Sequence, residues 1–231
     1  MMRHLSRVIR RRVGPVAGAG VLLAGGIGAG VLAGAGAAQA ASCSGAVAAG
    51  TTCTDAGALT FSGGSLTLTS PTALAWTAPD NGLNQGVVDT NTAQQSYVVD
   101  DATGSGAGWN VTVSATTFTN GTVSLPNTGT FSTNGSITSI VATAGPTAAC
   151  TSGATCTLPT DTSVTYPVAL TTAATTPTAF KIYDALVNTG LGSITIGLPG
   201  AAPVGWWVAV PANAKPATYL STVTLEVLSA P

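Results

Sequence analysis

Gly108-Trp109-Asn110-Val111-Thr112-Val113-Ser114-Ala115 is the stretch that decides the fold class of this chain. A tryptophan and two valines alternate with three polar residues, so apolar and polar side chains follow a period of two. Successive side chains of a β-strand point to opposite faces. The stretch therefore predicts a strand with one face toward a core and the other toward water.

Similar short runs recur along the chain, separated by glycine, asparagine, proline and serine. Residues 41–231 contain 38 threonines, and β-branched side chains suit pleated strands. We expect further strands at Ala58–Phe61, Ser65–Thr69, Thr72–Thr77, Ser96–Asp100, Thr122–Leu125, Ser136–Thr143, Ser163–Leu170, Phe180–Tyr183, Ser193–Leu198, Val204–Val210 and Thr218–Leu228. The sequence thus predicts an all-β domain, a single β-sandwich or barrel-like sandwich of about ten to twelve mostly antiparallel strands.

The first 40 residues have the pattern of a secretory signal peptide. Met1–Arg12 is basic and holds all five arginines and the only histidine, and an uncharged Ala/Gly/Val/Leu run follows it. Ala38-Gln39-Ala40 forms an A-x-A cleavage site. We expect cleavage before Ala41, which leaves residues 41–231 as one all-β domain without a membrane span. The alternative is a retained anchor, because the uncharged run is long enough to cross a bilayer.

Charge limits the function classes open to residues 41–231. They carry two lysines, Lys181 and Lys215, against eight acidic residues, a formal charge of −6. Without histidine there is no Ser-His-Asp or Cys-His catalysis and no His-ligated zinc, and without arginine there is no bidentate anion clamp. Two lysines cannot neutralise a nucleic-acid backbone. We therefore expect no enzyme and no nucleic-acid partner.

Four cysteines remain in the expected mature chain: Cys43, Cys53, Cys150 and Cys156. An even number in an exported chain indicates disulfides, and three pairings are open. The local pairing, Cys43 with Cys53 and Cys150 with Cys156, needs the least rearrangement of the chain. It predicts two disulfides that each close a loop.

Tryptophans and acids supply the candidate binding residues. Trp109 alternates with valines and fits a core position. Trp206 and Trp207 are adjacent, so on a strand they face opposite sides, which favours exposure of at least one. An exposed ring of this kind could stack on a sugar. Asp100 and Asp101 are candidate calcium ligands, with solvated acids or an Asx turn as the alternative.

Leu125-Pro126-Asn127-Thr128-Gly129 matches the L-P-x-T-G signal for covalent wall attachment. That signal needs a hydrophobic span and a basic tail directly after it, and neither follows here. Proline, asparagine and glycine are turn formers, so we interpret the motif as a turn.

The segment from Val98 to Ala115 resembles the first signature of WxL domains, in which a strand and an acidic glycine-containing turn precede Gly-Trp-x-Leu-x-Val. Leu59-Thr60-Phe61 and Pro71–Trp76 fit the family's opening strands, and the end from Val208 through Tyr219 to Pro231 resembles its closing signature. The resemblance covers residues 41–231. Valine stands in the leucine place of the first motif, and the second falls on Leu225-Glu226-Val227, without its tryptophan.

WxL domains are surface modules of Gram-positive bacteria that attach non-covalently to the cell wall, often with partner surface proteins. The resemblance implies an extracellular, wall-associated protein with peptidoglycan as ligand. Trp109, Trp206, Trp207 and Tyr219 are its candidate binding residues, and calcium at Asp100 and Asp101 is the one cofactor considered.

Two alternatives remain open. The first is a structural subunit of a surface layer or appendage that assembles through strand edges. The second is an enzyme that uses carboxylates, which would need Asp100, Asp101 and another acid together in a cleft.

Overall fold

The computed structural model describes residues 58–160 and 163–229. A compact unit begins at Phe61 and contains all the described strands. These are β1 (Leu66–Thr69), β2 (Gln85–Val88), β3 (Tyr97–Asp101), β4 (Trp109–Ala115), β5 (Phe131–Asn134), β6 (Ala148–Cys150), β7 (Val168–Leu170), β8 (Phe180–Ala185), β9 (Gly192–Ile196), β10 (Gly205–Val210) and β11 (Val223–Ser229). A single 3-10 turn, η1 (Thr92–Gln94), precedes β3.

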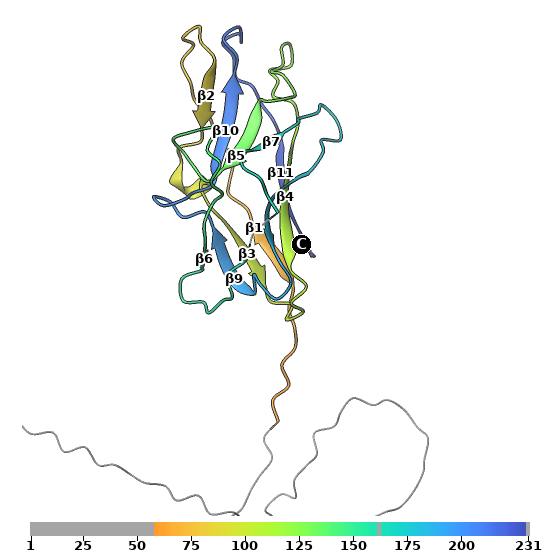
Figure 1. The fold of residues 1–231 in the computed structure, drawn as a ribbon. Helices are drawn as coiled ribbons and strands as arrows, with labels where there is room; N and C mark the ends of the chain where they lie inside the picture. The colour runs from red at the N-terminus through yellow and green to blue at the C-terminus, as the bar shows by residue number, and fades with distance from the viewer. Residues whose placement is uncertain (1–57, 161–162, 230–231) are drawn as a thin grey trace, which may run out of the picture. The chain divides into compact units, whose positions relative to one another are not determined.

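The strands form three antiparallel sheets, with the orders β1-β3-β9-β6, β2-β10-β5-β7 and β11-β4-β8 (Figure 1). Each sheet ends in edge strands, so the fold is sandwich-like and not a closed barrel. The expectation of an all-β sandwich is confirmed.

Strand β4 lies at the centre of its sheet, between β11 and β8. Trp109, Val111 and Val113 are fully buried, and the polar residues between them are half-buried. All seven residues of β4 pair with β11. The alternation that predicted this strand therefore also gives its orientation correctly.

Several sequence-based boundaries are wrong. Residues 58–61 and 72–77, which were expected to be strands, form no ladder, and β1 pairs with β3. The expected strand at Ser136–Thr143 is a loop. Its first turn is held by Asn134, whose Nδ2 donates to the carbonyls of Ser139 and Ile140, and such side-chain bonds compete with a ladder. Strands β2, β5 and β6 are too short and too irregular in pattern for periodicity to detect.

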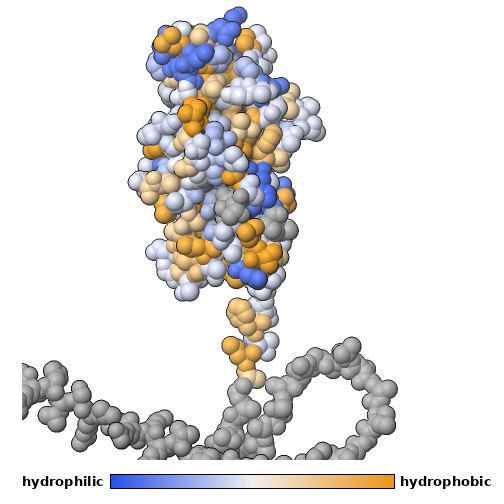
Figure 2. Space-filling view, in the orientation of Figure 1, coloured by the Kyte–Doolittle hydropathy of each residue, from blue (hydrophilic) through white to orange (hydrophobic). Residues whose placement is uncertain are grey.

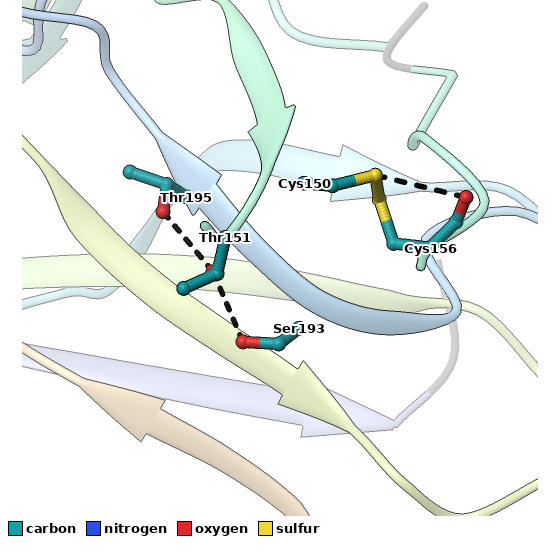
Figure 3. Close-up of a disulfide and its surroundings, with 5 residues drawn as sticks. All are labelled: Cys150, Thr151, Cys156, Ser193 and Thr195. Atoms are coloured by element: carbon teal, nitrogen blue, oxygen red, sulfur yellow. Dashed lines mark hydrogen bonds between the residues drawn. A yellow bond between two sulfur atoms is a disulfide. The ribbon is translucent and has the colours of Figure 1, made fainter. Parts of the chain in front are cut away.

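One predicted disulfide lies within the described residues. Cys150 at the end of β6 is bonded to Cys156 and closes a short loop beside the β6 edge (Figure 3). Thr151 links this loop to β9 through its hydroxyl, which lies 3.1 Å from that of Thr195 and accepts a hydrogen bond from Ser193 at 3.0 Å. Cys43 and Cys53 lie outside the described residues.

Candidate functional site

The three tryptophans proposed from the sequence as binding residues are core residues. Trp109 and Trp206 have no exposed surface, and Trp207 is 5% exposed. Trp109 stacks on Tyr183 and donates its indole N–H to the carbonyl of Gly190 at 2.8 Å. Because a buried ring presents no face to a ligand, none of the three can stack on a sugar in this structure.

The burial of both Trp206 and Trp207 corrects the expectation that one of them is exposed. They do face opposite sides of β10, and Trp206 packs on Phe131 in the core. The loop that follows β5 covers the other side, where the indole N–H of Trp207 donates to the carbonyl of Ser136 at 2.8 Å. Periodicity does not predict this cover, because residues 136–143 have the pattern of a strand but form a loop.

A groove of about 570 Å³ lies beside β2 and β10. Three parts of the chain line it: residues 74–87 around β2, Phe118 with Leu125, and residues 208–221 from the end of β10 into the loop before β11. Leu83 and Leu220 stand exposed on it, at 66% and 70%. An exposed apolar groove of this size is the strongest candidate for a binding site in the described part of the chain.

Trp76 and Tyr219 are the half-buried aromatic residues of the groove. The indole of Trp76 donates to the carbonyl of Trp206 at 2.9 Å, and its ring meets Phe118 and Phe131 edge-on, with centroids 5.7 and 5.8 Å apart. The hydroxyl of Tyr219 donates to the carbonyl of Lys215 at 2.9 Å. Both polar groups are satisfied within the protein, so the two rings are held in place and offer apolar surface.

The groove also carries charged side chains of both signs. Among the described residues that line it, Asp80 is the one acid and Lys215 the one base. The side chain of Gln85 is held in place, because its amide donates a hydrogen bond to the carbonyl of Pro79 at 2.8 Å. With a single carboxylate, the groove lacks the pair of acids that glycoside hydrolysis uses.

Of the predicted site residues, Tyr219 alone lines the groove. Trp76, Asp80 and Lys215 were not proposed from the sequence. The prolines near them, at positions 79, 211 and 216, indicate loops in the sequence. They do not indicate that these loops line one groove.

The structure does not bring Asp100 and Asp101 together as a calcium site. They are successive residues of β3, so their side chains leave opposite faces. Asp101 is buried, and its Oδ1 accepts hydrogen bonds from the backbone N–H and the hydroxyl of Thr103, at 3.0 and 2.6 Å. This is the turn predicted as the alternative. In residues 58–160 and 163–229, no three His, Cys, Asp or Glu side chains gather as a metal site.

The L-P-x-T-G match is part of the folded domain. Leu125 is buried, and its N–H donates to the carbonyl of Phe118 at 2.9 Å. The Asn127 side chain accepts a hydrogen bond from Thr117 at 2.7 Å. The motif therefore forms a packed turn, as predicted. No helix within the described ranges has the length and hydrophobicity of a membrane span.

The two stretches that resemble WxL signatures form neighbouring strands. Val111 on β4 pairs with Val227 on β11, and Val113 pairs with Leu225, the residue at the place of the second tryptophan. No family model, curated protein or solved structure matches this chain. The resemblance therefore rests on the sequence stretches themselves.

Proposed function

We propose that this protein is secreted, stays at the bacterial cell surface and binds the cell wall non-covalently, with peptidoglycan as ligand. The observation that carries the proposal is the groove with Trp76 and Tyr219. Both rings are held by internal hydrogen bonds and are partly open to solvent, as a preformed sugar-binding surface requires.

The mechanism we propose is stacking of a sugar ring on apolar surface, with hydrogen bonds from exposed groove residues such as Thr77 and Thr218. Stacking suits a chain with few charges, because it needs neither ion pairs nor a metal. The absence of histidine and arginine from residues 41–231 agrees with a binding role and not a catalytic one.

Co-sedimentation of the secreted protein with insoluble peptidoglycan, with and without calcium, tests this function. We expect the wild type in the pellet and a binding constant for Tyr219→Ala that is about threefold to tenfold weaker, from the loss of one aromatic contact. Phe61→Ala is the matched control, since Phe61 is 86% exposed and does not line the groove.

Wild type left in the supernatant under both conditions would contradict direct wall binding. Substitutions of Trp109 or Trp206 are poor tests, because removal of a buried tryptophan costs about 3–5 kcal/mol of stability and would lower binding by unfolding the domain.

The second candidate function is assembly into a surface layer or appendage. The observation that favours it is β11, a seven-residue strand at the edge of its sheet. Exposed edges accept added strands, but Glu226 at the middle of β11 opposes pairing of one β11 with another, because two like charges would meet. Light scattering of the purified protein separates the two functions, since assembly requires oligomers without any wall polymer.

A further inference from the structure

The mature chain that we expect has only two cationic side chains, and the structure gives them different roles. Lys181 lies 3.4 Å from the carboxylate of Asp184, which is almost fully buried and also accepts a hydrogen bond from Ser163. Lys181 is therefore occupied by an ion pair on β8. Lys215 lines the groove and makes no ion pair among the residues that the structure describes.

The loop that carries Lys215 is fastened on both sides. At its start, the N–H of Ala212 donates to the side chain of Asn84 at 2.8 Å, and the N–H of Ala214 donates to the carbonyl of Pro211 at 2.9 Å. At its end, the hydroxyl of Tyr219 donates to the carbonyl of Lys215 itself at 2.9 Å. The lysine backbone is thus fixed beside the aromatic surface, while its side chain reaches solvent.

Resting on the proposed function, we propose that the groove binds a sugar chain that bears an anionic group, a carboxylate or a phosphate, and that Lys215 contacts this group while the sugar stacks on the neighbouring ring of Tyr219. An ammonium hydrogen-bonds to either anion as a point charge. Hydrophilic residues lie beside hydrophobic ones at the end of the domain where β2 and β10 lie, as a ligand with both characters requires (Figure 2).

The formal charge of −6 on residues 41–231 repels an anion at long range, but it does not determine whether Lys215 contacts one. At physiological ionic strength, charges more than about 8 Å apart are largely screened, whereas a direct contact is screened much less. Asp80 is the acid that opposes an anion inside the groove, and its Oδ1 accepts a hydrogen bond from the N–H of Gly82 at 3.0 Å. The two charges of the groove therefore predict substitution effects of opposite sign.

The test compares three insoluble polymers in the co-sedimentation assay with the secreted protein. Untreated walls carry phosphate and carboxylate, walls stripped of phosphate polymers carry carboxylate, and chitin is neutral. We expect Lys215→Gln to weaken binding to charged walls about threefold to tenfold, with Lys215→Arg close to wild type and chitin binding unchanged. Asp80→Asn should strengthen binding to the same walls. The stripped walls tell carboxylate from phosphate as the source.

Lys181→Gln is the charge-matched control, because it removes the same net charge away from the groove; its melting curve shows whether it is folded. Equal binding by Lys215→Gln and wild type on charged walls would overturn the inference and leave wall binding intact. Equal weakening by a folded Lys181→Gln would also overturn it, as would weaker binding by Asp80→Asn, which indicates a cationic ligand. Wild type that sediments with none of the polymers would refute the proposed function itself.

Discussion

At the scale of single residues, the tryptophans show how this chain uses its few large side chains. Each of the four indole N–H groups donates to a backbone carbonyl: Trp76 to Trp206, Trp109 to Gly190, Trp206 to Gln94 and Trp207 to Ser136. A buried N–H without a partner would cost about 1–3 kcal/mol, so these bonds fix where each ring can lie. Tryptophan here joins loops to strands, and only Trp76 also reaches the surface of the groove.

Gly190 packs so closely against the indole of Trp109 that there is no room for a side chain at this position. Its φ is +68°, and an added Cβ would lie 2.4 Å from the Cβ of Ala185 and 2.6 Å from Nε1 of Trp109. We expect Gly190→Ala to lower the free energy of unfolding by about 3–5 kcal/mol, from the left-handed backbone and the overlap together. Urea denaturation measures this change.

Gly121→Ala is the control for the backbone term alone, since φ is +87° there and no atom lies within 4 Å of the added Cβ. It should cost about 1–2 kcal/mol. Equal losses for the two variants would show that the contact with Trp109 contributes nothing.

At the scale of elements, strands that lie far apart in the sequence pair with each other. Strand β1 pairs with β3 and not with the residues before Gly63, and β4 pairs with the last strand of the chain, β11. The tight turn at Asn120-Gly121 is local, with Thr119 bridged to Ser124. The strand pairing therefore joins residues that are far apart in sequence, whereas the loop after β6 is closed locally by its disulfide.

The double variant Cys150→Ser/Cys156→Ser tests the contribution of that disulfide. The bond closes a loop with a sequence separation of six, and the chain-entropy model gives about 2 kcal/mol for a loop of this length. We expect a loss of that size in urea denaturation, with the sandwich still folded. Wall binding should be retained, because neither cysteine lines the groove.

The double variant Cys43→Ser/Cys53→Ser is compared with Cys150→Ser/Cys156→Ser, because it removes the other predicted disulfide. Cys150 and Cys156 are bonded to each other, so the local pairing still predicts a bond between Cys43 and Cys53. A non-reduced peptide map that instead joins a cysteine of one pair to a cysteine of the other would contradict both the local pairing and the expected stability change.

At the scale of the whole molecule, the cleavage that we propose before Ala41 would change the net charge of the protein. The full chain has a formal charge of −1, and loss of the five arginines of residues 1–40 would bring it to −6. Residues 41–231 carry many more threonine, serine and asparagine side chains than charged ones, so their net charge bears on solubility and on long-range attraction but not on the fold.

Intact-mass measurement of the protein recovered from the culture medium tests the leader prediction. We expect a chain that begins at Ala41, because Ala38-Gln39-Ala40 presents the small residues that signal peptidase requires. A mass that includes residues 1–40, with the protein held in the membrane fraction, would support the retained anchor instead.

The sequence by itself determined what depends on neighbouring residues. The period of two in Trp109–Ala115, the threonine content and the glycine-containing turns gave the all-β sandwich, and a spacing of six residues gave the pairing of Cys150 with Cys156. The identity of the few ionisable residues likewise limited the chemistry, because composition does not change on folding.

The tertiary structure decided which side chains are covered by other parts of the chain and which distant segments lie side by side. Periodicity states that Trp206 and Trp207 face opposite sides of a strand, but only the loop after β5 decides that both are buried. The groove joins residues near positions 76, 118 and 215, and no local pattern encodes that meeting. Burial of a side chain is set by whatever packs against it, and here the packing partners lie about 70 to 130 residues away in the chain.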